Sequence, residues 1–275
     1  MPPVPLLELP TSGVHLWMAA VDDPAIDEAR MAAYRAWLSP GEAAQGSRYV
    51  FEKDRRRHLV TRALVRSVLS RYSRDRRPPQ DWAFEANEYG CPHVANPLEG
   101  MPPVVFNLSH TDTRVVMAVR AGLAVGVDIE AWDRRINLDI ADHFFSRDEV
   151  TALRSLPEAV QRERFMELWT FKESYIKARK MGLSIPLDGF GFEMAGTADV
   201  ALVLAPVLKE GDTPERWAFF QLRPGPDHVV ALCAERGPGA AHPPSIEWYQ
   251  WVPGSPSLPV RVECGVSRMS MPSLP

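Results

Sequence analysis

Apolar residues recur at two different periods along the chain, and the period separates predicted strands from predicted helices. Alternation and short apolar runs predict β-strands, while apolar residues at every third or fourth position predict helices. The predicted strands are 14–21, 82–85, 104–107, 114–120, 124–130, 190–194, 200–204, 217–223 and 229–234, with weaker strand character at 246–252. The predicted helices are 25–38, 40–72, 139–141, 147–156 and 158–180.

Two of the predicted helices begin with the same sequence signal. Ser39 precedes the helix that starts at Pro40, and Glu42 stands three residues after it. Ser146 and Glu149 have the same spacing at the start of 147–156. A serine followed three residues later by glutamate predicts a capping box, in which each side chain bonds a backbone N–H group of the other residue.

The order of the elements predicts an α+β fold built from two lobes. Each half of the chain has helices followed by antiparallel strands, which suggests a pseudo-twofold relation between an N-terminal lobe, residues 1–121, and a C-terminal lobe, residues 122–254. The proline-rich composition after residue 254 predicts a disordered tail, residues 255–275. Binding sites favour junctions between lobes, so we expect the site at this junction.

Composition narrows the class of protein. The 275 residues carry a net charge of −4 and are 45% hydrophobic, which is typical of a globular chain and gives no general reason to expect nucleic-acid binding. Cys91, Cys233 and Cys264 are too far apart for metal-ligand spacing, and a disulfide framework is not expected. The N-terminus does not resemble a signal peptide, and no stretch is apolar enough to span a bilayer. We therefore expect a cytoplasmic protein without a membrane or nucleic-acid partner; that it is a monomer is a separate expectation.

The strongest chemical signal is a set of three carboxylates. Asp128 and Glu130 are two apart on a predicted strand, so both point to one face. Glu173 lies on the last predicted helix together with Lys172 and Lys177. Hard cations such as Mg²⁺ prefer oxygen ligands and keep phosphates in their coordination shell. Carboxylates beside a lysine therefore suggest a metal-assisted reaction at a phosphate.

Each of these residues also has an ordinary structural interpretation. An isolated Asp-x-Glu is more often a solvated strand end than a metal site. Glu173 and Lys177 are four apart on a helix, which is the spacing of a surface ion pair worth a few tenths of a kcal/mol. The apolar residues of 125–129 and the apolar stripe beside Glu173 favour a partly buried site over these interpretations.

Residues 107–111, Asn-Leu-Ser-His-Thr, follow an apolar strand and supply several polar groups. A simple turn is one interpretation, because such side chains often bond their own backbone. Adjacent Ser109 and His110 point apart on a strand, and the chain lacks the Gly-x-Ser-x-Gly elbow of a hydrolase. Phosphate binding through Ser109 and His110 is the better functional hypothesis.

Arginines are concentrated between residues 48 and 77. On one continuous helix, Arg48, Arg55, Arg62 and Arg66 would lie near one face, with Arg57 off it. Some of them are expected to form a solvated face. A multiply phosphorylated ligand would use two or three, because the planar guanidinium binds phosphate through a fixed fork.

In order, these segments resemble the 4′-phosphopantetheinyl transferases, specifically the two-lobed type that acts on peptide and polyketide synthetase carrier proteins. The resemblance runs from about residue 38 to residue 233, with a weaker match at 246–254. The matching segments are 38–40, 48–57, Tyr89-Gly90 with Pro92, 107–110, 126–130, 144–146, 169–177, 182–184 and 186–187. Each segment alone is a weak signal, whereas the ordered set is specific.

The resemblance implies transfer of the phosphopantetheine arm of coenzyme A to a serine hydroxyl of an acyl or peptidyl carrier protein, with release of 3′,5′-ADP. It implies Mg²⁺, with Mn²⁺ as the alternative ion, held by Asp128, Glu130 and Glu173. Glu173, or Glu130 through a metal-bound water, would take the serine proton, and Lys177 would neutralise the pyrophosphate.

The resemblance also implies residues for the rest of coenzyme A. Ser109 and His110 would contact the 3′-phosphate, with Arg48 and Arg57 nearby. Tyr89 and Gly90 would border the adenine. By the same resemblance, the residues that contact coenzyme A are Arg48, Arg57, Tyr89, Gly90, Ser109, His110 and Lys177.

The chain departs from the family pattern at two places. Cys91 stands where Lys or Arg is usual, and residues 42–45, Glu-Ala-Ala-Gln, replace a stretch that is often basic. These departures leave open a degenerate member that binds coenzyme A or a carrier protein without turnover. A second alternative is a different metal-dependent phosphate enzyme, such as a nuclease, whose Asp-x-Glu…Glu set would look similar. Fatty-acid, polyketide and non-ribosomal peptide carriers all remain as partners.

Overall fold

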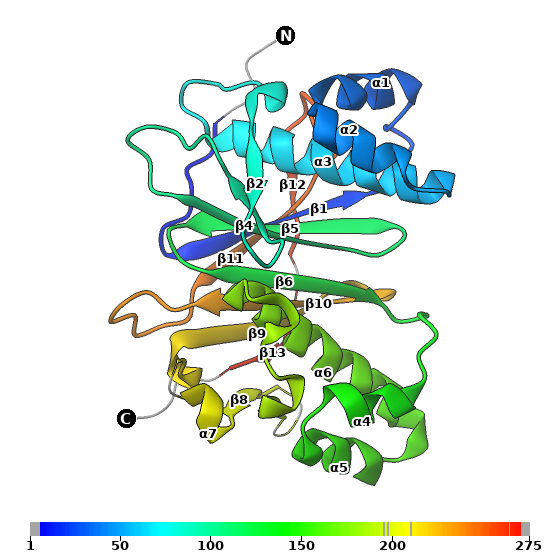
Figure 1. Ribbon diagram of the computed structural model, residues 1–275, viewed down its shortest axis with the longest axis vertical. Coiled ribbons are helices and arrows are strands. Elements are labelled where there is room, and N and C mark those ends of the chain that lie inside the picture. Colours follow the sequence, from blue (N-terminus) through cyan, green and yellow to red (C-terminus); the bar gives the residue numbers. More distant parts are fainter. Residues whose placement is uncertain (1–5, 195, 197, 210, 264, 271–275) are drawn as a thin grey trace. The chain divides into compact units, whose positions relative to one another are not determined.

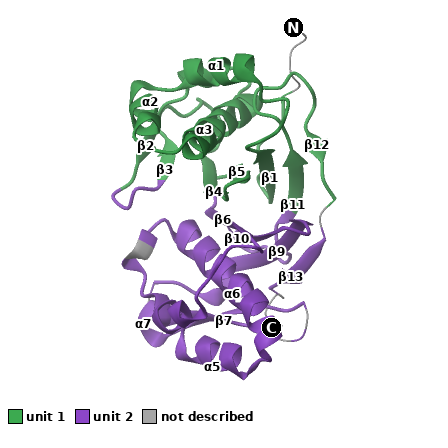
Figure 2. Ribbon diagram, turned by 90° about the vertical axis from the view of Figure 1, so that its right-hand side faces the viewer, with its two compact units in different colours: residues 1–87, 92–122, 246–263 green, residues 88–91, 123–245, 264–275 purple. Residues whose placement is uncertain are grey.

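Figure 1 shows a computed structural model that describes residues 6–270 except 195, 197, 210 and 264. The predicted α+β class is confirmed. The chain divides into two compact units, coloured in Figure 2: unit 1 comprises residues 1–87, 92–122 and 246–263, and unit 2 comprises 88–91, 123–245 and 264–275. Each unit packs helices against a β-sheet, whereas the predicted pseudo-twofold relation between them stays a prediction.

Unit 1 contains a five-stranded sheet with strand order β12-β11-β1-β5-β4. Its strands are β12 (Val260–Arg261), β11 (Ser245–Gln250), β1 (Gly13–Ala20), β5 (Arg114–Ala121) and β4 (Val104–His110), and a separate hairpin consists of β2 (Phe84–Ala86) and β3 (Pro92–Val94). The helices are α1 (Glu28–Trp37), α2 (Pro40–Ser47), α3 (Glu52–Tyr72) and the short η1 (Pro79–Asp81). Helix α3 contacts strands β1 and β5, and helices α1 and α2 contact α3 (Figure 1).

The core of unit 1 is centred on Trp17. Its indole is fully buried, stacks on the Tyr249 ring at a centroid distance of 4.8 Å, and donates a 2.9 Å hydrogen bond to the Tyr72 hydroxyl. Tyr72 ends α3 and Tyr249 lies on β11. Through these contacts β11 belongs to the core of unit 1, although the sequence placed residues 246–254 in the C-terminal lobe.

Unit 2 contains a four-stranded sheet with strand order β13-β9-β10-β6 and a two-stranded sheet of β7 and β8. The strands are β6 (Val125–Ala131), β7 (Phe190–Glu193), β8 (Ala201–Leu204), β9 (Trp217–Gly225), β10 (His228–Glu235) and β13 (Val266–Met269). The helices are η2 (Leu138–Ile140), α4 (Ala141–Phe144), α5 (Arg147–Ser155), α6 (Glu158–Arg179), η3 (Gly182–Ser184), η4 (Leu187–Gly189), α7 (Pro206–Lys209) and η5 (Pro214–Arg216). Helix α6 contacts both β6 and β10 (Figure 1).

The prediction of a disordered tail is wrong for the described residues after 254. Val260 pairs with Gln250 on β11, and Met269 pairs with Phe220 on β9. Strand pairing gives this proline-rich stretch backbone hydrogen bonds that its composition does not reveal. Residues 264 and 271–275, and with them Cys264, lie outside the described part. Of the other cysteines, Cys91 is partly buried and Cys233 is buried.

The predicted helix over residues 40–72 is also wrong, because it is divided into α2 and α3. Arg48 is the C-cap of α2 and Phe51 the N-cap of α3. The Arg55 guanidinium donates hydrogen bonds to the carbonyl oxygens of Tyr49 and Val50, at 2.7 and 3.0 Å. These bonds satisfy backbone groups that a continuous helix would have paired. Arg48 therefore does not share a helix face with the later arginines.

The predicted capping boxes are both present, and the second one extends into a buried ion pair. In the first, Ser39 and Glu42 bond each other's backbone N–H groups. In the second, Glu149 bonds the Ser146 backbone and also accepts a 2.8 Å hydrogen bond from the Lys172 ammonium of α6. The Lys172 ammonium donates a further 2.6 Å bond to the Phe190 carbonyl of β7. Lys172 thus joins α5, α6 and β7.

Removing one partner of this buried pair is expected to be costly. Lys172→Met should lower the free energy of unfolding by about 3–5 kcal/mol, because the Glu149 carboxylate then stays buried without its cation. Both side chains are at most 3% exposed. Urea unfolding at neutral pH measures the change.

The matched control is Arg154→Met. Arg154 pairs with Asp142 at 2.9 Å, but both side chains are about half exposed, so the loss should stay below about 1 kcal/mol. Equal losses for the two variants would contradict the assignment of Lys172 as the anchor of α6.

Candidate functional site

The candidate site is formed where α6 packs against the edge strand β6. Gly126 lets the two backbones approach closely, because a Cβ atom at this position would lie 2.0 Å from the Ser174 carbonyl oxygen and 2.4 Å from the Ala178 nitrogen. Both distances are far below van der Waals contact, so no other residue fits without displacing the helix. This packing places the face of β6 that carries Gly126, Asp128 and Glu130 against α6.

The predicted alternation along β6 is present in the structure. Val125, Val127 and Ile129 are buried on the opposite face. On the α6 side, the Lys177 ammonium donates a 2.7 Å hydrogen bond to Asp128 Oδ1, and Asp128 is itself 4% exposed. The predicted lysine is therefore paired with a strand carboxylate, and its charge also acts on Glu173 of its own helix.

Glu130 is held by a residue that sequence reasoning did not assign to the site. The Arg134 guanidinium donates a hydrogen bond to Glu130 Oε1. Arg134 follows β6 in a turn that the Ala131 carbonyl closes by accepting a 3.2 Å bond from the Arg134 N–H. The adjacent Arg134-Arg135 pair was visible in the sequence, but its pairing with Glu130 depends on this turn.

The carboxylates are close enough to affect each other's ionisation. Burial, followed by the Asp128 charge and a smaller contribution from Glu173, raises the pKa of Glu130 to about 7. Burial, followed by the Asp128 charge, also raises the pKa of Glu173. The cations Lys177 and Arg134 act in the opposite direction on both glutamates. The site therefore concentrates negative charge that nearby cations offset only in part.

The types of donor fit a hard divalent cation. All three carboxylates supply oxygen ligands, and Mg²⁺ is commonly bound by one or two carboxylates together with water and substrate phosphates. Within residues 6–270, apart from the four gaps, no three His, Cys, Asp or Glu side chains are arranged as a complete metal-binding group. Asp128 and Glu130 instead face Lys177 and Arg134. A cation would thus be held by these carboxylates together with a phosphate ligand.

The predicted coenzyme A residues of unit 1 are placed on α2, α3 and β4. Arg57 pairs with Asp54 at 2.8 Å and with Asp112 at 2.9 Å. Arg48 is exposed at the end of α2. Arg57 is therefore fixed by two carboxylates, while Arg48 projects toward solvent.

Ser109 and His110 end strand β4. They pair with Val116 and Val115 of β5, and they differ in exposure: Ser109 is buried, whereas His110 is exposed. This difference agrees with the expected alternation of side chains along a strand. Their assignment to one phosphate stays a prediction.

Tyr89 and Gly90 lie in the turn between β2 and β3, in the short segment that groups with unit 2. Gly90 has φ of +81°, a backbone conformation that favours glycine. The Tyr89 Cβ atom lies 3.9 Å from the Cβ position at Gly182. In the same segment, burial raises the pKa of the Cys91 thiol while the Lys180 charge lowers it. Lys180 thus brings positive charge close to the position where the family usually has a basic residue.

The departure at Glu42 has a structural cause. Besides capping α2, Glu42 Oε2 accepts a 2.6 Å hydrogen bond from Arg66, which is 1% exposed. Arg62 is 3.8 Å from the other carboxylate oxygen. Arg62 and Arg66 are therefore weaker candidates for phosphate binding, because the Glu42 carboxylate already pairs with both of them. Glu42 stands at a position where the family often has a basic residue.

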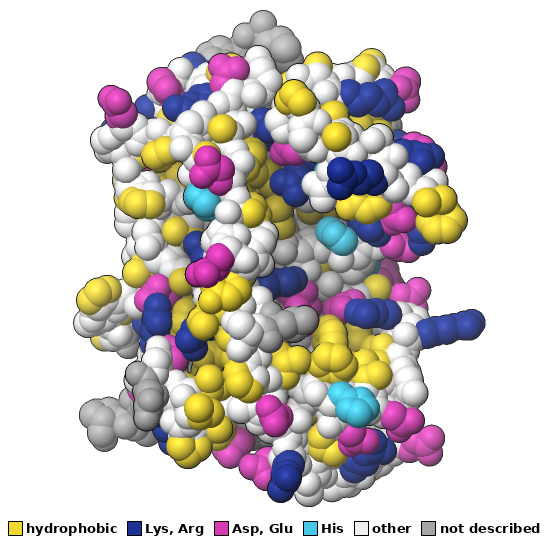
Figure 3. All heavy atoms as spheres, in the orientation of Figure 1, with side chains coloured by type: hydrophobic (Ala, Val, Ile, Leu, Met, Phe, Trp, Pro, Cys, Tyr) yellow, Lys and Arg dark blue, Asp and Glu magenta, His cyan; other side chains and the backbone are white. Residues whose placement is uncertain are grey.

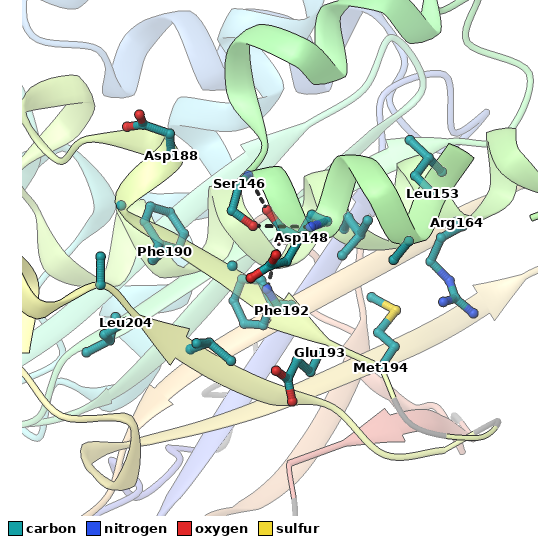
Figure 4. Close-up of a pocket in the computed structure, with 17 residues that line it drawn as sticks. Ser146, Asp148, Leu153, Arg164, Asp188, Phe190, Phe192, Glu193, Met194 and Leu204 are labelled. Atoms are coloured by element: carbon teal, nitrogen blue, oxygen red, sulfur yellow. Dashed lines mark hydrogen bonds between the residues drawn. The ribbon is translucent and has the colours of Figure 1, made fainter. Parts of the chain in front are cut away.

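Figure 4 shows a cavity of about 420 Å³ elsewhere in unit 2, between α5, β7 and β8. Its walls include apolar side chains and charged ones, among them Leu153, Phe192, Asp148, Arg164 and Glu193. None of the predicted site residues lines it. We place the functional site at the carboxylates of β6 and α6, because the residues predicted for chemistry at a phosphate lie there and none of them lines this cavity.

The face of the molecule drawn in Figure 3 shows no gathering of basic side chains. On the face shown in Figure 3, Lys and Arg side chains are interspersed with Asp and Glu side chains. A nucleic-acid-binding surface is expected to gather basic residues in a patch or stripe.

None of the described helices is both long and apolar enough to cross a bilayer.

Two family models together match most of the chain. Residues 124–233 match the 4′-phosphopantetheinyl transferase superfamily, and residues 24–122 match the model described as 4′-phosphopantetheinyl transferase, N-terminal. The two matches meet where the structure divides unit 1 from unit 2, next to residue 122.

Individual relatives carry the same description. The chain is 32% identical over 211 residues to the 4′-phosphopantetheinyl transferase Sfp of Bacillus subtilis (strain 168), covering 76% of this chain and 85% of the relative. It is 35% identical over 202 residues to the transferase ffp of Bacillus subtilis, covering 73% and 84%. It is 30% identical over 240 residues to the transferase HetI of a Nostoc species, covering 87% and 94%.

The close packing at Gly126 can be tested by adding one methyl group. Gly126→Ala should lower the free energy of unfolding by about 3 kcal/mol or more, because the new Cβ atom meets helix backbone that cannot rotate away. Urea unfolding measures the loss. Gly41→Ala is the control: the nearest atom to its Cβ position is 4.0 Å away, so stability should be unchanged or slightly higher. A tolerated Gly126→Ala would contradict the tight packing of α6 on β6.

The raised pKa of Glu130 predicts a pH dependence of stability in metal-free protein. Between the ordinary pKa of 4.5 and the folded value of about 7, the unfolded chain has lost its proton while the folded protein keeps it. Stability should therefore fall as pH rises through this range, by about 3 kcal/mol in total for this group. Unfolding free energies measured in EDTA from pH 4.5 to 8 test this expectation.

Glu130→Gln should flatten the pH dependence, because the amide does not titrate. Glu99→Gln, at an exposed position, should keep the wild-type slope. An unchanged slope in Glu130→Gln would show that Glu130 is not the group responsible.

Proposed function

Because the chain belongs to the 4′-phosphopantetheinyl transferase superfamily, we propose that it transfers the phosphopantetheine arm of coenzyme A to a serine hydroxyl of an apo carrier protein, releasing 3′,5′-ADP. The observation that carries the proposal is the cluster of Asp128, Glu130 and Glu173 with Lys177, formed by β6 and α6 within unit 2. These are the residues that the family pattern assigns to metal binding and catalysis.

Asp128, Glu130 and Glu173 would hold Mg²⁺ or Mn²⁺ in this proposal. The ion would neutralise charge on the pyrophosphate and on the leaving 3′,5′-ADP. The carboxylates' contribution is to gather negative charge at one place before the ion arrives. Their mutual effect on pKa supports this role, because a bound cation relieves the same repulsion.

Lys177 would bind a pyrophosphate oxygen. An ammonium group has three N–H donors, so the 2.7 Å contact with Asp128 can persist while the lysine binds a phosphate. That contact also directs the lysine toward the carboxylates. Lys177 would thus orient the phosphate and stabilise charge that develops during transfer.

A glutamate carboxylate would accept the proton of the carrier serine. A general base works best when its pKa lies near the working pH, and both glutamates are shifted upward from their ordinary value. Glu173 is the direct candidate, and Glu130 the alternative acting through water. Their raised pKa values support either assignment and do not separate the two.

The remaining contacts of coenzyme A stay as the family pattern implies. Ser109 and His110 would bind the 3′-phosphate with Arg48 and Arg57, and Tyr89 with Gly90 would border the adenine. For Arg57 this role requires sharing its guanidinium with Asp54 and Asp112. Lys180 would supply positive charge near Cys91. The cytoplasmic location and the monomeric state stay predictions as well.

The test is intact-mass spectrometry of an apo carrier protein incubated with this protein, coenzyme A and Mg²⁺. Wild type should increase the carrier mass by one phosphopantetheine arm. Glu173→Gln should abolish or strongly slow the gain, because the variant keeps the size of the side chain but loses the carboxylate. Glu99→Gln should retain wild-type activity. Several carrier classes belong in the assay, because the sequence does not name the partner.

Two other results would replace the proposal. Binding of coenzyme A by wild type without any mass gain, across fatty-acid, polyketide and peptide carriers, would identify a degenerate family member. Full activity of Glu173→Gln would remove Glu173 from the catalytic role.

A further inference from the structure

The turn after β6 holds Arg134 in a defined position. The Trp132 N–H donates a 2.9 Å bond to the Asp227 carbonyl, and the Arg134 N–H bonds the Ala131 carbonyl at 3.2 Å. The Arg162 guanidinium donates a 2.7 Å bond to the Arg134 carbonyl. Backbone and side-chain contacts from β6, α6 and the loop before β10 thus fix the chain at this arginine.

Arg134 and Lys177, the two cations beside the carboxylates, differ in how exposed they are and in which carboxylate they pair with. Lys177 is 25% exposed and pairs with Asp128, which is nearly buried. Arg134 is 51% exposed and pairs with Glu130, whose side chain is 14% exposed. Water can solvate the half-exposed guanidinium when the pair separates, so this pair costs less to break than one in which both partners are buried.

Arg134 therefore occupies a carboxylate that the proposed metal site needs. A cation that binds Glu130 must take the place of the guanidinium at Oε1 or bind against its positive charge. In either case, breaking the Arg134–Glu130 pair or opposing its charge offsets part of the free energy of cation binding. The affinity for the cation is therefore lower than it would be at the same site without Arg134.

We propose that Arg134 is a built-in counter-ion that holds Glu130 in the metal-free protein and lowers the affinity of the site for a divalent cation. The inference rests on the proposed function, since it takes Glu130 as a metal ligand. Arg134 is a positioning residue in this scheme: it keeps Glu130 directed along β6 and yields it when the ion binds.

The experiment is a titration of the full-length protein with Mn²⁺ alone, followed by electron paramagnetic resonance of the unbound ion, with Mg²⁺ competition as a second measurement. Arg134→Gln should tighten Mn²⁺ binding by roughly three- to tenfold, because both the ion pair and the repulsion between cations are removed. Arg134→Lys should give an intermediate affinity, because it keeps the charge but not the planar fork.

Two controls separate this inference from the proposed function. Arg135→Gln changes the neighbouring exposed arginine by the same chemistry and should leave Mn²⁺ affinity within about twofold of wild type. Asp128→Asn should abolish or strongly weaken binding if the carboxylates form the site. Circular dichroism and urea unfolding confirm that each variant is folded.

Each pattern of results has a definite meaning. Tighter binding in Arg134→Gln but not in Arg135→Gln supports the counter-ion role. Equal or weaker binding in Arg134→Gln, with loss of binding in Asp128→Asn, overturns the counter-ion role and leaves the proposed metal site standing. Absence of Mn²⁺ binding in wild type and Arg134→Gln alike, or full binding in Asp128→Asn, overturns the metal site and the counter-ion role together.

Discussion

The candidate site depends on the close approach of two backbones at Gly126. Strand β6 supplies Asp128 and Glu130, and helix α6 supplies Glu173 and Lys177, so the four groups meet only if strand and helix lie closer than a side chain would allow. Glycine satisfies this requirement by having no Cβ atom. The 2.7 Å contact between Lys177 and Asp128, two positions along β6 from the glycine, is the direct consequence. Burial of this interface also raises the pKa of both glutamates, so packing and chemistry share one cause.

A second constraint fixes the rotation of α6 about its axis. Lys172 is next to Glu173 in sequence, but its ammonium turns away to the buried Glu149 carboxylate and to the Phe190 carbonyl. Buried ion pairs are poor sources of stability, because desolvation offsets most of the attraction. Their better-attested contribution is to favour one arrangement over its neighbours, and here a different rotation of the helix would leave both charges buried without partners. In this interpretation the adjacent residues have different roles: Lys172 fixes the orientation of α6, and Glu173 belongs to the candidate site.

The sequence predicted the parts of this site that depend on local periodicity. Alternation along a strand placed Asp128 and Glu130 on one face, and the serine–glutamate spacing located the starts of α2 and α5. The sequence-based prediction failed where contacts between distant residues determine the structure. The break between α2 and α3 is accompanied by hydrogen bonds from Arg55 to two carbonyl groups. Strands β12 and β13 form by pairing with β11 and β9, which the local sequence does not reveal. Arg134 was missed for the same reason, since its reach to Glu130 depends on a turn closed by backbone hydrogen bonds. Glu42 looked like the loss of a phosphate contact and is instead the partner of buried Arg66.

The distribution of charge around β6 distinguishes the candidate site from a structural ion pair such as Lys172–Glu149. Loss of hydration, followed by repulsion from the Asp128 carboxylate, raises the pKa values of Glu130 and Glu173 in this partly buried region. A purely structural cluster would be expected to pair each carboxylate fully, as Glu149 is paired by Lys172 and two backbone N–H groups. Around β6 the cations are fewer than the carboxylates, and one of them, Arg134, is half exposed. Such an arrangement, which contrasts with the fully paired Glu149 carboxylate, is typical of a site that binds a charged ligand.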